Sequence, residues 1–137
     1  MVESWVLFAS ASLLLFGIMN FVLKFVSDKA PVPLLTFVIY LSTIILPLGY
    51  FVFSGTKFQI TNNVLALTVL IGIIGSAAFI SMTYALRAGT ASQVIPVINL
   101  NTLVTVALAV LIINEKLTPK IGLGVVFAVV SLYLLTS

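Results

Sequence analysis

Residues 64–86 have the sequence VLALTVLIGIIGSAAFISMTYAL, an uncharged and strongly apolar run that decides the fold class. A helix needs about 20 such residues to cross the hydrocarbon core of a bilayer. The run does not alternate between polar and apolar residues, as a strand of a membrane barrel would. Because a backbone in lipid must satisfy its own hydrogen bonds, the run predicts a transmembrane helix.

The same pattern extends to both ends of the 137-residue chain. The six basic and three acidic residues separate five uncharged stretches, 4–23, 30–56, 58–86, 88–114 and 121–137. Each stretch is long enough to span a bilayer, the last one only just. We therefore expect an all-α integral membrane protein, with residues 1–137 forming one transmembrane domain. The five predicted helices cover about residues 5–23, 34–53, 64–86, 93–113 and 120–136. Pro47 is expected to bend the second helix near its end.

The composition excludes most other classes of protein. The chain is 62% hydrophobic and 7% charged, whereas soluble domains are about 45–50% apolar and about 25% charged. The absence of Cys and His removes thiol nucleophiles, imidazole proton relays and zinc sites built on these residues. No general base or nucleophile pair lies in the core of a predicted span, so an enzyme is not expected. We also expect no cofactor, no metal and no nucleic-acid partner.

The basic residues are divided equally between the two sides of the predicted membrane domain. The side of the N-terminus carries Lys57, Lys116 and Lys120. The opposite side carries Lys24, Lys29 and Arg87. The positive-inside rule orients a chain by the difference between the two sides, and here the difference vanishes. Two interpretations follow: other signals orient the chain, or the chain inserts in both orientations and pairs antiparallel.

One segment carries a family resemblance. The residues Tyr84–Ser92, YALRAGTAS, are followed by Pro96, by Asn114–Thr118, NEKLT, and by Gly122. This pattern resembles the second part of an EamA-like unit of the drug/metabolite transporter superfamily. Phe16, Gly17, Asn20 and Lys24 fit the opening of the unit more loosely. Larger members carry two such units in inverted topology, so the resemblance implies one half of a ten-helix inverted-repeat fold. The related four-helix small multidrug resistance transporters work as antiparallel homodimers.

The resemblance and the charge balance favour the same function. We expect a multi-pass protein of the cytoplasmic membrane that moves a small polar or amphipathic metabolite by alternating access, as an antiparallel (dual-topology) homodimer. The alternatives are half of a heterodimeric transporter or flippase, and a non-transporting membrane subunit of a larger complex. The small multidrug transporters use a Glu within their first helix. Here Glu3, Asp28 and Glu115 lie at helix edges or in loops, which favours transport driven by the substrate gradient or coupled through an edge group.

Polar and small residues at helical spacing mark a candidate substrate path. Residues three, four or seven apart share one face of a helix, and such lines occur on the first, third and fourth predicted helices. The candidate substrate-binding residues are Asn20, Ser76, Phe79, Thr83, Tyr84, Asn99 and Asn101. The candidate hinge or gating residues are Gly17, Gly72, Gly75 and Pro96. On a regular helix Asn99 and Asn101 point about 200° apart, so only one of them can face a shared cavity.

Each of these features also has a purely structural interpretation. Small residues in membrane helices often permit close packing, and buried Asn side chains often bond a neighbouring helix. Lys24 and Arg87 are expected to extend to the membrane interface, and Glu115 to hold the loop before the fifth helix. The pair Thr118 and Pro119 predicts a cap followed by a first-turn proline.

Overall fold

The structure is a computed structural model that describes residues 4–116 and 118–136. Within these ranges the chain forms seven helices and no strand, which confirms the predicted helical class. Glu3 and Leu117, which contribute to the patterns above, lie outside the described residues. The chain divides into two compact units, Met1–Ala88 and Gly89–Ser137, and each is described by itself.

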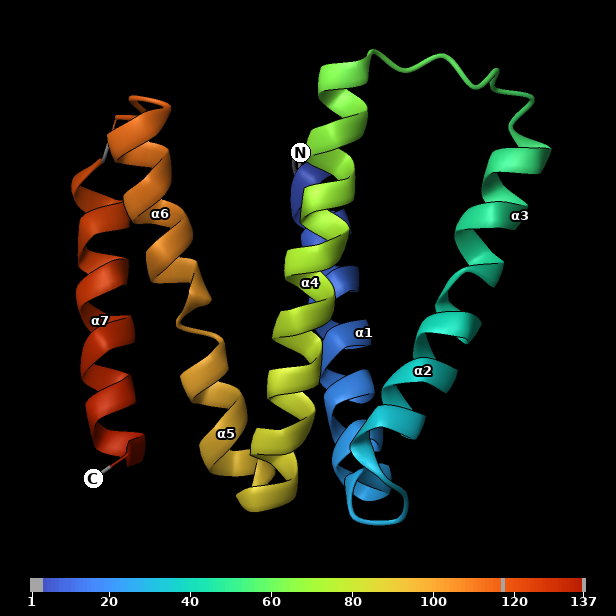
Figure 1. The fold of residues 1–137 in the computed structure, drawn as a ribbon. Coiled ribbons are helices and arrows are strands. Elements are labelled where there is room, and N and C mark those ends of the chain that lie inside the picture. The colour runs from blue at the N-terminus through green and yellow to red at the C-terminus, as the bar shows by residue number, and fades with distance from the viewer. Residues whose placement is uncertain (1–3, 117, 137) are drawn as a thin grey trace. The chain divides into compact units, whose positions relative to one another are not determined.

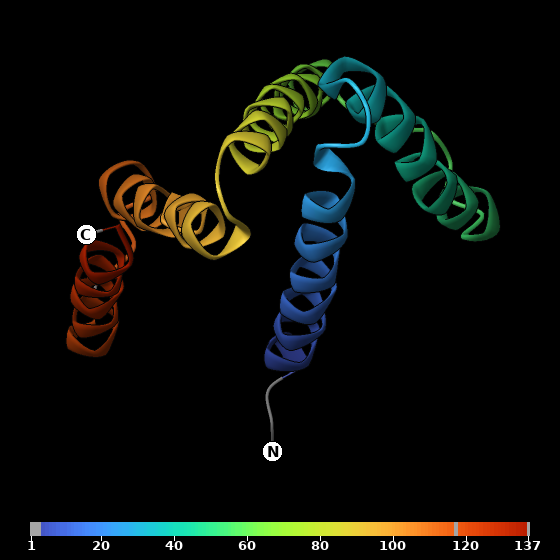
Figure 2. The ribbon, with the colours of Figure 1, turned by 90° about the horizontal axis from the view of Figure 1, so that it is seen from below.

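The first unit consists of α1 (Ser4–Ser27), α2 (Val32–Thr43), α3 (Ile45–Phe53) and α4 (Asn62–Ala88). Both α1 and α2 pack against α4, and α3 diverges from α4 beyond the end of α2 (Figures 1 and 2). The predicted helices at about 5–23, 34–53 and 64–86 are thus present. α1 continues to Ser27, whose Oγ donates a hydrogen bond of 2.9 Å to the carbonyl oxygen of Lys24 and closes the last turn.

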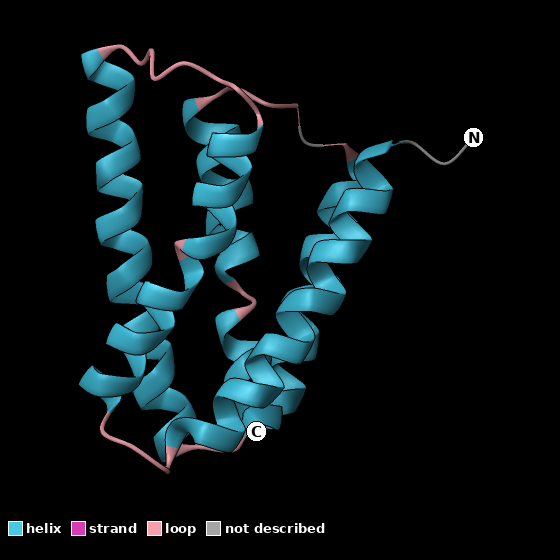
Figure 3. Ribbon diagram, turned by 90° about the vertical axis from the view of Figure 1, so that its right-hand side faces the viewer, coloured by secondary structure: helices cyan, strands magenta, loops and turns pink. Residues whose placement is uncertain are grey.

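The second predicted helix is interrupted at Ile44, between α2 and α3 (Figure 3). Pro47 has no N–H group, so it leaves the carbonyl of Thr43 without its helical donor, and its ring crowds that carbonyl. Regular bonding resumes at once, because the amide of Leu48 donates to the carbonyl of Ile44 at 3.0 Å. The helix that Pro47 was predicted to bend is thus interrupted, and the interruption lies at Ile44, before the proline, and not near the end of the helix.

The second unit consists of α5 (Ala91–Ile98), α6 (Asn101–Ile112) and α7 (Pro119–Thr136), with α7 packed against α5. The predicted cap of the last helix is confirmed. Pro119 is its first residue, and the amide of Ile121 donates to the Thr118 hydroxyl at 3.4 Å. Before the helix, Asn114 adopts a left-handed conformation with φ 59°. This turn brings the amide of Glu115 to the carbonyl of Ala109 at 3.1 Å.

The fourth predicted helix, about residues 93–113, is not continuous. A turn at Asn99 and Leu100 separates α5 from α6 (Figure 3). Here the amide of Leu100 donates to the carbonyl of Val97 at 3.2 Å, and the amide of Leu103 donates to the carbonyl of Leu100 at 2.8 Å. These bonds connect residues three apart, so the backbone tightens into a 3₁₀-like turn. The expectation of one regular helix is therefore wrong in this segment.

Among the described residues, four helical segments are long and apolar enough to cross a membrane. They are Trp5–Ser27, Val32–Phe53, Asn62–Ala88 and Ala91–Ile112. The apolar part of α7, Pro119–Ser131, is shorter, and the fifth span stays a prediction. Large apolar side chains cover these helices on the outside, up to Phe53 at 92% exposed. Such a surface is suited to contact with lipid rather than water.

Candidate functional site

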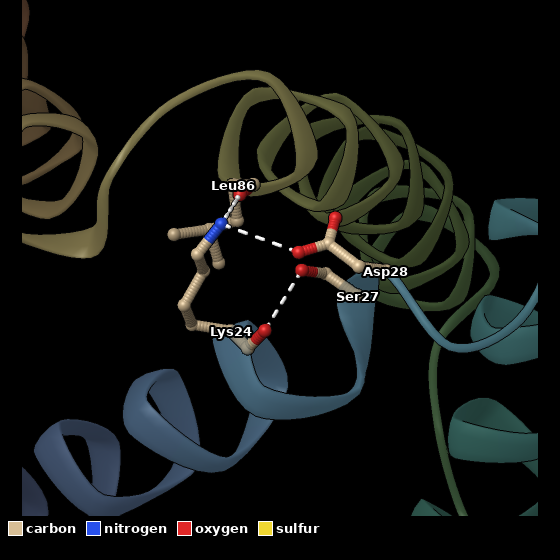
Figure 4. Close-up of polar contacts among 4 residues, drawn as sticks. All are labelled: Lys24, Ser27, Asp28 and Leu86. Atoms are coloured by element: carbon tan, nitrogen blue, oxygen red, sulfur yellow. Dashed lines mark hydrogen bonds and ion pairs between the residues drawn. The ribbon is translucent and has the colours of Figure 1, made fainter.

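The C-terminal ends of α1 and α4 are joined by a charged side chain. The ammonium group of Lys24 donates a hydrogen bond of 2.6 Å to the carbonyl oxygen of Leu86 and lies 3.6 Å from the carboxylate of Asp28 (Figure 4). The last carbonyls of a helix lack partners within the helix, and a cation there also interacts favourably with the helix dipole. The structure directs the ammonium group of Lys24 to the end of α4, and its expected extension to the membrane interface stays a prediction. The contact brings the C-terminal ends of α1 and α4 together. The equal division of basic residues between the two sides assumes this arrangement, because it assigns Lys24 and Arg87 to the same side.

A pocket of about 340 Å³ lies between α2 and α4 within the first unit. It is lined by Val32, Pro33, Thr36, Phe37, Tyr40, Ser76, Ile80 and Tyr84. Two of the predicted binding residues, Ser76 and Tyr84, therefore line a common pocket. None of the lining residues is charged, and four of them carry a hydroxyl group. We refer to this site as the α2–α4 pocket.

The hydroxyl groups of the α2–α4 pocket differ in what they bond. The Thr36 hydroxyl donates to the carbonyl of Val32 at 2.9 Å, and the Ser76 hydroxyl donates to the carbonyl of Gly72 at 2.7 Å. Both therefore use their proton within their own helix. The hydroxyl of Tyr84, which is 52% exposed, makes no hydrogen bond within the described part of the chain.

Tyr40 connects α2 to α4, and the sequence analysis missed it. Its hydroxyl donates to the carbonyl of Gly75 at 3.3 Å. Its ring meets Phe79 edge to face, with the ring centres 5.6 Å apart. A signal was available, because Thr36 and Tyr40 are four residues apart and so share one face of the second predicted helix. The predicted substrate path had included faces of the first, third and fourth predicted helices only.

The other candidates of the first unit have different surroundings. Phe79 is half-buried against Tyr40, and Thr83 is fully buried, with its hydroxyl donating to the carbonyl of Phe79 at 2.8 Å. Neither residue lines the pocket, and Phe79 is connected to it through the ring of Tyr40. Asn20 is half-buried on α1, and its buried Oδ1 atom has no hydrogen-bond partner in the described structure. A buried polar atom of this kind calls for a partner from a ligand, water or a second chain.

Asn99 and Asn101 lie on either side of the turn in the second unit. Both are exposed, Asn99 at the end of α5 and Asn101 as the first residue of α6. The Thr105 hydroxyl donates to the carbonyl of Asn101 at 3.0 Å. Because the turn interrupts the helix, the 200° separation expected for a regular helix does not apply. Ser76 belongs to the other unit, so a layer shared by Ser76 and Asn99 stays a prediction.

The candidate hinge residues lie in open surroundings. A Cβ atom added at Gly17, Gly72 or Gly75 would meet nothing within 4 Å in the described structure. Close packing within the first unit therefore does not require glycine at these positions. Pro96 lies within α5, half-buried, and its missing N–H leaves the carbonyl of Ser92 without a helical donor.

Comparison with known proteins gives one family match, which covers almost the whole chain. The sequence profile of the EamA-like transporter family matches residues 3–137. No curated protein and no solved structure matches the chain. Among the described residues, no group of three or more acidic side chains is arranged to hold a metal ion.

Proposed function

The chain belongs to the EamA-like transporter family, and from this membership we propose that it moves a small polar or amphipathic metabolite by alternating access. Members of the family are membrane transporters and not enzymes. The chain is thus a multi-pass membrane protein of the drug/metabolite type with a small-molecule substrate. We assign it to the cytoplasmic membrane, with α7 as the fifth span.

The α2–α4 pocket is the observation that carries the proposed mechanism. Ligand sites in proteins are concave and mostly apolar, with a few polar groups at defined positions. The α2–α4 pocket has this character, because hydroxyl-bearing residues from both helices line a mostly apolar space of about 340 Å³. The unpartnered amide oxygen of Asn20 on α1 adds a further polar group to the same unit. Asn99 and Asn101 would extend the path from the second unit.

The proposed assembly is an antiparallel homodimer. Two copies of one five-helix unit, inserted in opposite directions, would form the ten-helix inverted repeat that transporters use for alternating access. The equal division of the basic residues supports insertion in both directions. The bond between Lys24 and Leu86 joins the end of α1 to the end of α4. It therefore supports the placement of Lys24 and Arg87 on the same side of the membrane, on which this division depends. Half of a heterodimeric transporter or flippase, or a subunit of a larger complex, remains the alternative assembly.

Transport by the purified protein in liposomes tests this proposal. A set of metabolites is screened for uptake or exchange, and the solute that is moved is then measured with Ser76→Ala and Ser81→Ala. Both serines lie on α4 and both donate to the carbonyl four residues before them, at 2.7 and 2.9 Å, but only Ser76 lines the pocket. Ser76→Ala should reduce uptake, and Ser81→Ala should not. A protein that moves no solute and purifies only with a larger partner would favour the subunit alternative.

A further inference from the structure

We infer that the α2–α4 pocket takes an uncharged solute that has a compact apolar body and one hydroxyl group. The inference rests on the proposed function and names the substrate class of the same site. It follows from three observations. Most hydroxyl groups of the pocket already donate a hydrogen bond within the protein, none of the lining residues is charged, and aromatic rings form part of the lining.

Most hydroxyl groups of the pocket already donate their proton to a hydrogen bond within the protein. The hydroxyls of Thr36, Tyr40 and Ser76 each donate to a backbone carbonyl. A hydroxyl that has used its proton still offers lone pairs as acceptors. These three groups therefore present acceptors to a ligand. Tyr84 alone among the pocket hydroxyls keeps a free proton within the described structure, and it can donate to a ligand. The best complement is a group that donates and accepts at once, which is the property of an alcohol.

Charge is absent from the walls of the pocket. A charged ligand entering an apolar space loses hydration and needs a counter-ion or several hydrogen bonds in exchange. A carboxylate would find one free donor, Tyr84. An ammonium ion would find no carboxylate in the lining. Asp28, the acidic residue at the end of α1, is not part of the lining and lies 3.6 Å from the ammonium group of Lys24. An uncharged ligand avoids this cost altogether.

Aromatic side chains give the pocket its shape. Phe37, Tyr40 and Tyr84 contribute rings to the lining, and the Tyr40 ring is held edge to face by Phe79. Rings interact favourably with flat or compact apolar groups through offset or edge-to-face contacts. The volume of about 340 Å³ is at the small end of the range for ligand pockets, about 300–1,000 Å³. A solute with one or two rings and a hydroxyl group fits this description.

Cysteine protection measures binding directly. The chain has no native Cys, so Ile80→Cys places the sole thiol in the pocket, and Phe37→Cys provides a second pocket position should the first variant fold poorly. Ile73→Cys, on α4 outside the pocket and 63% exposed, is the matched control. The probes share one ring system: 2-naphthylmethanol, its methyl ether, 2-naphthoate and 2-naphthylmethylammonium. The rate of modification by a small thiol reagent is measured against probe concentration in the purified protein.

The alcohol should protect both pocket cysteines and leave Ile73→Cys unprotected. The ether cannot donate, so it should bind about 3–10-fold more weakly, and the two ions should bind more weakly still. Tyr84→Phe and Thr36→Val, each combined with Ile80→Cys, should weaken protection by the alcohol by a similar factor. Tyr50→Phe, which alters an exposed tyrosine of α3 outside the pocket, should not. Equal protection by ether and alcohol, or better protection by the ammonium ion through the aromatic faces, would overturn the inference.

This experiment separates the inference from the proposed function. If the alcohol protects the pocket but liposomes move no solute, the ligand class stands and the transport proposal fails. If liposomes move a charged solute and the alcohol does not protect, transport stands and the inferred ligand class fails.

Discussion

The Nζ atom of Lys24 lies 2.6 Å from the carbonyl oxygen of Leu86, so a side chain of α1 closes the last turn of α4. Leu86 is fully buried at this junction, and the backbone group that accepts the bond would otherwise lack a partner. The contact joins two helices that are separated by more than sixty positions in the chain. It also keeps the charge of Lys24 close to Asp28.

Replacing Lys24 with Met should lower the free energy of unfolding by about 1–2 kcal/mol, because hydrogen bonds to charged groups are among the stronger ones. Lys29→Met is the control. Lys29 lies 3.5 Å above the ring of Phe25, and an exposed contact of this kind contributes about 0.5–1 kcal/mol. Denaturation of the purified protein in detergent, followed by circular dichroism, gives both values. Equal losses in the two variants would show that Lys24 has no special role in closing α4.

Gly72→Ala should leave stability unchanged or raise it by up to about 1 kcal/mol, because Ala favours a helix interior over Gly and the added Cβ meets nothing within 4 Å. Transport should nevertheless become slower if Gly72 acts as a hinge. Gly124→Ala is the control, since its Cβ also meets nothing within 4 Å and it is not a hinge candidate. Thermal melting and initial uptake rates measure the two effects. A loss of stability or of the dimer would show instead that Gly72 packs against a second copy.

Asn99→Leu should abolish or alter transport while the dimer remains intact. Hydrogen bonds between membrane helices contribute on average about 0.6 kcal/mol, so the change should cost little in association. Asn101→Leu, on the other side of the turn, is the comparison variant. Uptake assays and size-exclusion chromatography measure the two properties. Normal transport by Asn99→Leu, with only a loss of stability, would make the residue structural and direct the search for the ligand layer to Asn101.

Both ends of the chain should be accessible from both sides of intact cells if insertion is dual. Because the chain has no native Cys, single cysteines introduced at residues 2 and 136 can be labelled with a membrane-impermeant reagent before and after permeabilisation. Two additional lysines at the C-terminus should fix one orientation and reduce activity, and a copy with the opposite bias should restore it. Labelling of each position from one side only would contradict dual topology.

Transport should follow the gradient of the substrate and not a gradient of protons. The acidic residues of the described part, Asp28 and Glu115, lie at helix ends, and neither lies in the core of a candidate span. Uptake into liposomes is measured with and without a pH difference of two units, which provides about 2.7 kcal/mol per proton. Equal steady-state levels are expected. If accumulation against the gradient stops when a protonophore is added, Glu115→Gln is the first variant to test.

The membrane helices could be predicted because hydropathy is a local property. Uncharged runs of about 20 residues leave the backbone few alternatives to a helix. The interruption at Ile44 could be anticipated in the same way, since Pro47 lacks a donor whatever surrounds it. The turn at Asn99 and Leu100 could not be anticipated. Pro96 removes the helical donor of the carbonyl of Ser92, but it does not specify the bonds between residues three apart that form at Val97 and Leu100.

The candidate site was predicted in part. Ser76 and Tyr84 were found because a helical face is visible in sequence as a spacing of three or four residues. Tyr40 shares a helical face with Thr36, but its contact with α4 could not be predicted, because its partner is a backbone carbonyl, that of Gly75, which every residue type supplies and no sequence pattern marks. The same reason hides the acceptor of Lys24, the carbonyl of Leu86.

The interruption at Ile44 affects how the segment formed by α2 and α3 is rotated about its long axis in the membrane. The side chains of α3 are apolar on almost every side, so their polarity gives little preference for one rotation of this helix over another. The carbonyl of Thr43, however, lacks a helical donor because of Pro47, and an unsatisfied peptide group facing acyl chains costs several kcal/mol. At the junction of α2 and α3 the main chain therefore defines a side that must turn away from lipid, where the apolar side chains of α3 alone would leave that side undefined.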